Sequence, residues 1–508
     1  MRSASILLLT IATLSAAANT QNTVTIRNGK LSGAPAKDPS IIAFKGIPYA
    51  APPVGELRWR PPQPPASWTN VRDASAFAAS CPQDIVTERK PWTAEFMTHN
   101  ETNEDCLYLN VWTQARFTGK KRPVFVWIHG GAFSEGSGAV PVYDGQGLAS
   151  KGLVVVTINY RLGILGFFTY PELTKESPHH ASGNYGLLDQ VAALHWVRDN
   201  IAQFGGDPGN VTIAGQSAGA SSVYALIASP LARDLFQRAI AESGLRVGRP
   251  MKSLKEQEEA GAHFAASKGF HTLAELRAAK PEQIKAPTFT FVPVVDGYLL
   301  PMDIDQIFSE GQQNDVPTLT GWTQDDIGVI SNPKTTLDSF KQMARQRYGK
   351  MAEPFLNVYP ASNEEQARQA ETESSRDQMR VATFLWAVKR NKSSQTPVFT
   401  FYWNHALPGP DAAHFGAFHS SELPYVLNTL FTCDRPIKPN DSQIANMVSQ
   451  YWANFAAKGD PNGKGLADWP DVRKEQPMTM QLGDDSGMIP VTATPERLDF
   501  WRHFLDVR

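Results

Sequence analysis

The sequence predicts an α/β fold with a large, mostly parallel central sheet and helices on both of its faces. From about residue 107, apolar segments typical of strands alternate with segments that have helical spacing. Residues 124–128 and 153–158 form continuous apolar runs, as expected of strands that are buried on both faces. Alternation of strands and helices indicates parallel pairing with crossover helices. Ligands are then expected to bind outside the carboxyl ends of the strands.

The first residues have the features of a secretory signal peptide. Arg2 supplies a positive charge, and residues 6–17 form an apolar run that is too short to span a membrane. Small residues at 16–18 are suited to cleavage before Asn19. We therefore expect a signal peptide over residues 1–18, a secreted or periplasmic protein, and no membrane anchor.

The rest of the chain, residues 19–508, is expected to form a single domain with long loops and helical insertions. No internal repeat, low-complexity tract or clear linker interrupts it. Residues 24–68 favour short strands and turns, and residues 251–290 favour a polar helical insertion. Between and after these segments, the sequence predicts strands at 124–128, 153–158, 211–213, 238–241, 316–319 and 398–403, and helices at 187–204 and 220–228.

Charge and cysteine content exclude several classes of function. The net charge of −2 gives no electrostatic signal for nucleic acid or for anionic membranes. Of the three cysteines, Cys81 and Cys106 are closest in sequence, and the segment between them is polar. An oxidising compartment would allow them to form a disulfide, leaving Cys433 as a free thiol. No cysteine has metal-ligand spacing, so we expect no metal site.

The most informative motif is Gly215-Gln216-Ser217-Ala218-Gly219. It follows the β-branched run at 211–213 and precedes the helix-favouring run at 220–228. Small residues on both sides of a serine allow a sharp strand–turn–helix connection that exposes its Oγ, the nucleophile elbow of α/β-hydrolases. A serine hydroxyl needs a base and a carboxylate that orients the base. In these hydrolases the chain order is serine, acid, histidine.

A second motif, residues 129–133, follows the predicted strand at 124–128. Its small residues allow backbone N–H groups to point at one spot, as an oxyanion hole requires. His129 opens this motif but lies upstream of Ser217, so it does not fit the order expected of the base. A plain glycine-rich turn is the simpler alternative, and the neighbouring elbow motif favours the oxyanion interpretation.

Position in the sequence alone does not decide which histidine is the base or which aspartate is the acid. Asp325 and Asp326 follow the strand predicted at 316–319, and either could serve as the acid or merely cap a helix. Two histidines, His414 and His419, share the loop at 413–422. The other histidines downstream of the serine are His263 and His271, expected to be solvated, His405, directly after a strand, and His503, near the C-terminus.

With these residues identified, the chain resembles the type-B carboxylesterase family, which includes cholinesterases and bacterial para-nitrobenzyl esterases. The resemblance runs from about residue 24 to the C-terminus. It rests on four separate motifs, namely Phe44–Ala50 with Pro52–Gly55, Glu104–Val111, Phe204–Pro208 leading to Gly219, and Gly416–Leu423.

The resemblance implies roles for individual residues. It selects His419 as the base and Asp326 as the acid, although the family usually has glutamate followed by a small residue where this chain has Asp326-Ile327. It also matches Cys81 and Cys106 to the family's first disulfide. Ser243 resembles a serine that family members bury near the triad. The implied oxyanion hole consists of Gly131, Ala132 and Ala218.

The expected function is therefore that of a secreted serine carboxylesterase that acts on a small-molecule ester through an acyl-enzyme, without metal or organic cofactor. One alternative is a lipase, but the loop between Cys81 and Cys106 has no broad apolar stripe of the kind an interfacial flap uses. Another is a non-catalytic cholinesterase-like binding protein, against which the presence of every triad candidate argues. The sequence predicts neither the identity of the ester nor the oligomeric state.

Overall fold

A mixed sheet of eleven strands forms the centre of the molecule. The computed structural model describes residues 22–115, 119–244, 250–286, 291–326, 334–472 and 476–506. The signal peptide predicted over residues 1–18 lies outside them. The strand order is β14-β13-β12-β11-β10-β9-β7-β8-β6-β4-β3, and every pair from β8 to β13 is parallel. Antiparallel strands flank this parallel centre on both sides. The predicted fold class is confirmed.

Its strands are β3 (Ala34–Pro35), β4 (Ile41–Pro48), β6 (Tyr108–Gln114), β7 (Arg122–Ile128), β8 (Val154–Ile158), β9 (Gly206–Gln216), β10 (Arg238–Glu242), β11 (Thr318–Thr323), β12 (Val398–Trp403), β13 (Met478–Leu482) and β14 (Gly487–Pro490). A small separate sheet contains β1 (Thr23–Ile26), β2 (Gly29–Ser32) and β5 (Arg72–Asp73).

The longer helices are α5 (Tyr185–Asn200), α6 (Ala218–Ala228), α7 (Leu254–Ser267), α10 (Leu337–Tyr348), α12 (Glu364–Asn391), α15 (Pro439–Lys458) and α16 (Pro495–Asp506). Shorter ones are α2 (Gln146–Ala149), α3 (Gly163–Phe167), α4 (Pro171–Glu176), α8 (Leu273–Ala278), α9 (Ile304–Ser309), α11 (Ala352–Val358), α13 (Ala412–Phe415) and α14 (Leu423–Val426). None of the described helices is long and apolar enough to cross a membrane.

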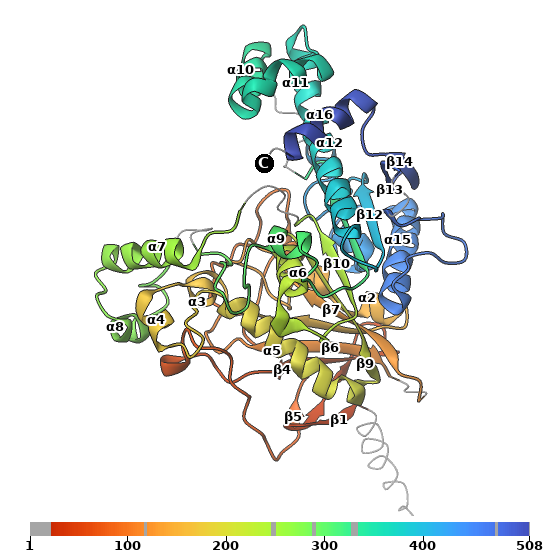
Figure 1. Cartoon of the computed structure of the whole chain (residues 1–508). Helices are drawn as coiled ribbons and strands as arrows, with labels where there is room; N and C mark the ends of the chain where they lie inside the picture. Colours follow the sequence, from red (N-terminus) through yellow and green to blue (C-terminus); the bar gives the residue numbers. More distant parts are fainter. Residues whose placement is uncertain are drawn as a thin grey trace, which may run out of the picture.

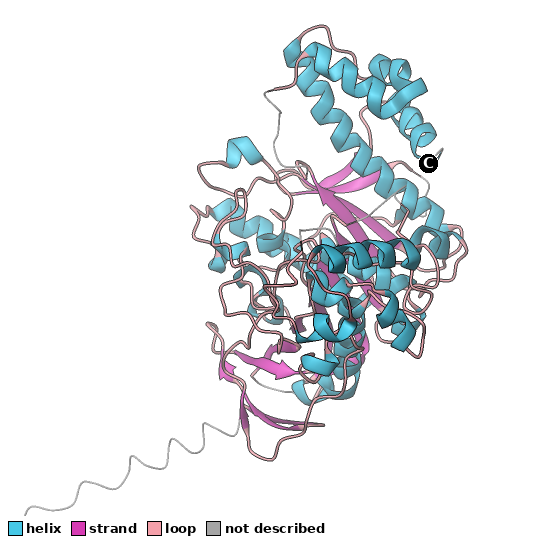
Figure 2. Cartoon of the chain, turned by 90° about the vertical axis from the view of Figure 1, so that its left-hand side faces the viewer, coloured by secondary structure: helices cyan, strands magenta, loops and turns pink. Residues whose placement is uncertain are grey.

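Each face of the sheet has its own hydrophobic core, and β7 shows how one strand serves both. Successive side chains of a strand point to opposite faces. Accordingly Val124 and Val126 belong to one buried cluster, together with apolar residues of α5 and α6. Phe125 and Trp127 belong to the other cluster, together with apolar residues of α15. Figure 2 shows the strands running through the molecule with helices packed on both sides. This double burial explains the uninterrupted apolar sequence of β7.

The structure contains a helical unit that the sequence analysis did not predict. Helices α10, α11 and α16 lie together with the first part of α12 at one end of the molecule, away from the sheet (Figure 1). Four aromatic residues from α10, α11 and α16 fill this unit, namely Tyr348, Phe355, Phe500 and Trp501. The 28 residues of α12 then extend from the unit to pack on β11 and β12.

A disulfide joins Cys81 to Cys106, and Cys433 is a free, half-buried thiol. The disulfide closes a loop that passes over the carboxyl ends of the central strands, because Trp92 and Phe96 from this loop line the same cavity as Ser217. The cross-link therefore limits the freedom of one wall of that cavity.

Close packing of glycines forms the turn between β9 and α6. Ser217, at this turn, has φ 59° and ψ −122°, a conformation that non-glycine residues rarely adopt. A Cβ atom on Gly219 would lie 2.1 Å from the carbonyl oxygen of Ile128, and one on Gly215 would lie 2.6 Å from the carbonyl carbon of Gly219. Only glycine allows α6 to begin so close to the end of β7.

We predict that Gly219→Ala lowers the melting temperature strongly, because its methyl group would overlap backbone atoms that cannot move independently. Gly487→Ala is the matched control, since no atom lies within 4 Å of a Cβ built there. Thermal unfolding followed by circular dichroism measures both variants. Equal melting temperatures for the two variants would contradict the packing argument.

Candidate active site

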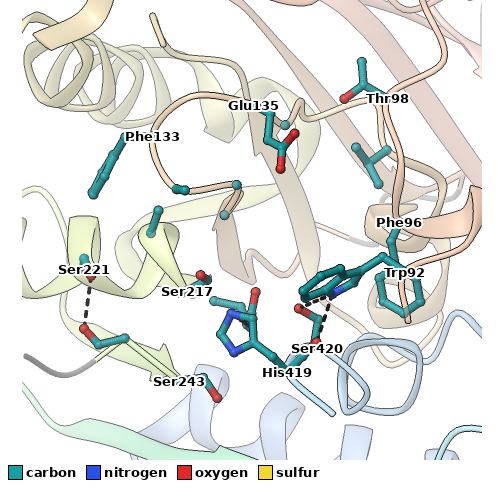
Figure 3. A pocket seen from close by; sticks show the side chains of 18 of the residues that line it. Trp92, Phe96, Thr98, Phe133, Glu135, Ser217, Ser221, Ser243, His419 and Ser420 are labelled. Atoms are coloured by element: carbon teal, nitrogen blue, oxygen red, sulfur yellow. Dashed lines mark hydrogen bonds between the residues drawn. The ribbon is translucent and has the colours of Figure 1, made fainter. Parts of the chain in front are cut away.

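A cavity of about 720 Å³ lies at the carboxyl ends of the central strands. It is lined by the segments that follow β7, β9, β10 and β11, by the loop that carries His419, and by the disulfide loop. Figure 3 shows Ser217, Ser243 and His419 on one side of it, with Phe133 and Glu135 across from them and Trp92 and Phe96 beside His419. The cavity therefore brings together motifs that lie far apart in the sequence.

Ser217 stands at the point where β9 ends and α6 begins. Its N–H donates to the carbonyl oxygen of Glu242 at 2.8 Å, which ties the turn to the end of β10. Its carbonyl oxygen accepts the N–H of Ser221 at 2.9 Å and so starts the helix. The side chain faces the cavity, and its Oγ makes no hydrogen bond to any described residue.

His419 lines the same cavity and has the geometry of an ion pair with Asp326. Nδ1 of His419 lies 3.0 Å from Oδ1 of Asp326, and Oδ2 of Asp326 accepts the hydroxyl of Thr323 at 3.0 Å. Burial lowers the pKa of His419, but the charge of Asp326 and its hydrogen bond outweigh burial and leave the pKa above its ordinary value. The other ring nitrogen, Nε2, lies 3.0 Å from Nε2 of Gln216.

The neighbouring aspartate has a different environment. Oδ2 of Asp325 accepts the N–H of Ala417 at 2.9 Å, and its Oδ1 pairs with Arg376 at 2.5 Å. The N–H of Asp325 also donates to the carbonyl oxygen of Ala417 at 2.9 Å. Asp325 thus fastens the loop that carries His419 to the end of β11, while the carboxylate of Asp326 lies against the imidazole.

The remaining histidines lie elsewhere. His414 is exposed on α13, and His263, His271 and His503 are exposed as well. His405 binds Asp441 and Asp484 through its two ring nitrogens, at 2.8 and 2.6 Å. None of these side chains lines the cavity. Among the residues that the structure describes, no cluster of histidine, cysteine and acidic side chains is suited to hold a metal ion.

The glycine-rich loop after β7 turns sharply beside Ser217. Gly131, Ala132 and Phe133 all have positive φ, at 99°, 56° and 61°. The carbonyl oxygen of Gly131 accepts the N–H groups of Ser134 and Glu135, at 2.9 and 3.0 Å. Within the described residues, the N–H groups of Gly131 and Ala132 have no acceptor of their own. Unpaired N–H groups at this place are available to a negatively charged oxygen.

His129 is hydrogen-bonded to the backbone of this loop. Its ring stacks on Tyr160 with the ring centres 4.4 Å apart, and its Nδ1 donates to the carbonyl oxygen of Gly130 at 2.8 Å. Complete burial lowers the pKa of His129 to about 4. The imidazole is therefore neutral near pH 7, and it holds the loop rather than exchanging protons with a ligand.

The sequence analysis did not identify two buried carboxyl groups near the site. Glu242 and Glu422 are completely buried, and the only described partner of either carboxyl is the indole N–H of Trp452, which donates to Glu242. Burial raises the pKa of Glu242 to about 8. Burial also raises the pKa of Glu422 well above its usual range, and repulsion from Glu242 raises it further. The available signal was Glu242, directly after the strand predicted at 238–241.

Ser243 follows Glu242 and lines the cavity. Its φ is 52°, and its N–H donates to the carbonyl oxygen of Gly321 at 2.8 Å. Its hydroxyl is buried and has no partner among the described residues. The serine therefore lies close to the base, in keeping with the place that the resemblance gave it (Figure 3).

Trp92 of the disulfide loop also contacts His419. Its indole N–H lies 3.0 Å from the carbonyl oxygen of His419 and 3.4 Å from the hydroxyl of Ser420. Its ring meets the imidazole edge to face, with centres 6.4 Å apart. The contact spans more than three hundred residues of sequence, and no local pattern indicates it.

Comparison with known proteins gives a consistent result. The family model described as "Carboxylesterase family" matches residues 20–501. The chain is 36% identical to a fumonisin B1 esterase of Sphingopyxis macrogoltabida, with 93% of this chain and 89% of that protein covered. It is 36% identical to the para-nitrobenzyl esterase of Bacillus subtilis, with 94% and 97% covered. A solved structure described as a PNB esterase has a TM-score of 0.76 at 32% identity and covers 94% of this chain and 100% of its own.

We predict that the pKa of His419 lies above its ordinary value in the folded protein and falls in Asp326→Asn, which removes the charge and the hydrogen bond that oppose burial most strongly. Because the folded pKa is raised, the stabilisation from this pair is complete below about pH 6.5 and is lost as the pH rises through the folded pKa. Nuclear magnetic resonance on histidine-labelled protein measures the titration.

The control for this titration is Asp411→Asn, which removes an exposed carboxylate near the same loop. It should leave the titration of His419 unchanged. A pKa that does not fall in Asp326→Asn would show that Asp326 is not the main charge acting on this ring.

Proposed function

We propose that this chain, which belongs to the carboxylesterase family, hydrolyses carboxylic esters with Ser217 as nucleophile, His419 as base and Asp326 as the acid that orients the base. The observation that carries the proposal is the meeting of Ser217, His419 and the loop at Gly131 in one cavity, with Asp326 on Nδ1 of His419. A nucleophile, an oriented base and unpaired N–H donors at one place suit acyl transfer better than any other reaction.

The roles follow from the hydrogen bonds. A carboxylate can only accept, so Nδ1 of His419 carries the proton that faces Asp326. Its Nε2 then carries a lone pair, which takes the proton from Ser217 as Oγ attacks the ester carbonyl. After the tetrahedral intermediate collapses, the imidazolium gives this proton to the departing alcohol. Water then attacks the acyl-enzyme by the same route and releases the acid.

Three N–H groups would stabilise the negative oxygen of the tetrahedral intermediate, those of Gly131, Ala132 and Ala218. The first two lie in the strained loop after β7, and the third lies in the first turn of α6. A helix N-terminus adds favourable electrostatic potential for an anion. The loss of one such donor typically costs about 3–4 kcal/mol of transition-state stabilisation.

The cavity walls favour a small, partly apolar ester. Aromatic side chains form much of the lining, namely Trp92, Phe96, Phe133, Tyr143 and Trp322. A volume of about 720 Å³ is in the range of sites that enclose a drug-sized ligand. Two relatives are named for esters of small molecules, fumonisin B1 and para-nitrobenzyl esters. We propose the same broad class of substrate for this chain.

The alternative of a lipase receives less support from the disulfide loop. Its large apolar side chains, Trp92 and Phe96, line the cavity instead of forming a stripe at the surface. Ile85 is the loop's one large hydrophobic residue that is well exposed, at 46%, among the described residues. Soluble esters should therefore be hydrolysed without the rate increase that emulsified substrate gives a lipase.

We predict that Ser217→Ala and His419→Ala each lower kcat by about 10³-fold or more on a soluble aryl ester, because either change removes the activated nucleophile. His414→Ala is the control, since it removes an exposed histidine of the neighbouring segment. Stopped-flow absorbance measures the burst of aryl alcohol that accompanies acyl-enzyme formation. A full burst in Ser217→Ala would refute the assignment of the nucleophile.

Secretion is a separate proposal that rests on residues 1–18 and is compatible with the Cys81–Cys106 disulfide. We predict that expression of the full chain in a host with a secretory pathway yields a protein whose first residue is Asn19. N-terminal sequencing of the exported protein checks this. A mature chain that retains Met1 inside the cell would exclude it.

A further inference from the structure

The imidazole of His419 is held at both of its nitrogens. Asp326 lies 3.0 Å from Nδ1, and the amide nitrogen of Gln216 lies 3.0 Å from Nε2. Ser217, directly after Gln216 in the chain, makes no hydrogen bond to the ring within the described structure. In this state the proposed base is therefore in contact with the residue before the nucleophile and not with the nucleophile itself.

The direction of this second hydrogen bond follows from the first. With its proton on Nδ1, a neutral imidazole can only accept at Nε2. The side-chain nitrogen of Gln216 carries two hydrogens and can only donate. Its N–H therefore points at the lone pair that must take the proton from Ser217. The amide and the hydroxyl compete for one acceptor.

Gln216 is well placed to keep this contact. It is the last residue of β9, its backbone is paired with Glu242 of β10, and its side chain is 2% exposed. Its Oε1 lies 3.3 Å from the position that a Cβ on Gly130 would occupy. The amide thus has the glycine-rich loop near its oxygen and the imidazole near its nitrogen.

We propose that Gln216 is a positioning residue for this reaction, whose amide holds the imidazole of His419 in its neutral form and gives up Nε2 when Ser217 transfers its proton. The inference rests on the proposed function, because it concerns the same base. An imidazolium carries a proton on Nε2 and cannot accept from the amide. Gln216 in this orientation therefore stabilises the neutral base and disfavours its charged form.

Other charges that act on the ring come from three elements. Asp326 follows β11, Glu422 lies in the turn after His419, and Glu242, at the end of β10, acts on the ring only through its repulsion of Glu422. All of these groups stay the same when only Gln216 is changed. A change in the titration of the base can then be assigned to the amide.

The test is the pH dependence of kcat/KM on a soluble aryl ester for Gln216→Met and Gln216→Glu. Methionine has a similar size and cannot donate to Nε2, so the midpoint of the acid limb should rise by about half to one pH unit. Glutamate adds a negative charge beside Nε2 and should raise it further than methionine does. Gln190→Met is the control, because the buried amide of Gln190 donates to Ser222 and does not contact the ring.

The proposal is supported if the midpoint of the acid limb rises from the native protein to Gln216→Met and again to Gln216→Glu. Midpoints that stay at the native value, or that fall, in the folded variants would overturn it. If Gln216→Met does not fold, Gln216→Leu takes its place, because leucine also cannot donate to Nε2 and adds no charge. The burst assay on Ser217→Ala separates failure of the proposed function from failure of the role of Gln216. A burst that survives in Ser217→Ala defeats the proposed function. Unchanged midpoints of the acid limb defeat only the role of Gln216.

Discussion

The close approach of the β9–α6 turn to the end of β7 is the contact on which the site depends. Gly219 lies against the carbonyl of Ile128, and no larger residue fits there. The contact fixes the distance between Ser217 and the glycine-rich loop, which follows β7 directly. Because β7 and β9 pair in parallel, both segments leave the sheet at the same edge. The proposed nucleophile and the proposed oxyanion donors are therefore held together by packing in the sheet and not by any direct bond between them.

Two adjacent aspartates make different contacts with His419 and its loop. Asp325 binds Arg376 and the backbone of Ala417, and so anchors the loop. Asp326 contacts the imidazole and supplies the charge that outweighs the effect of burial on its pKa. One carboxylate thus binds the framework while the other binds the imidazole. The shorter side chain of aspartate, compared with the glutamate usual in the family, still reaches His419 at 3.0 Å.

The sequence predicted those parts of the fold that depend on local pattern. Uninterrupted apolar runs identified β7, β8 and β12, and small residues around Ser217 identified the turn before α6. Local patterns of this kind do not predict contacts between segments that are distant in the sequence. The preference for Asp326 came from family resemblance, and only the structure showed that Asp325 faces Arg376 instead. Likewise, nothing in the motif around Ser217 indicated that the side chain of Gln216 would lie on the ring of His419, because that depends on a loop two hundred residues away.

The most direct test is a crystal structure of the protein after reaction with an aryl phosphonate, which imitates the tetrahedral intermediate. The account predicts phosphorus bonded to Oγ of Ser217 and a phosphonyl oxygen within about 3 Å of the N–H nitrogens of Gly131, Ala132 and Ala218. It also predicts that Nε2 of His419 has left Gln216 and faces the adduct. An unmodified Ser217, or an adduct whose oxygen points away from these three N–H groups, would contradict it.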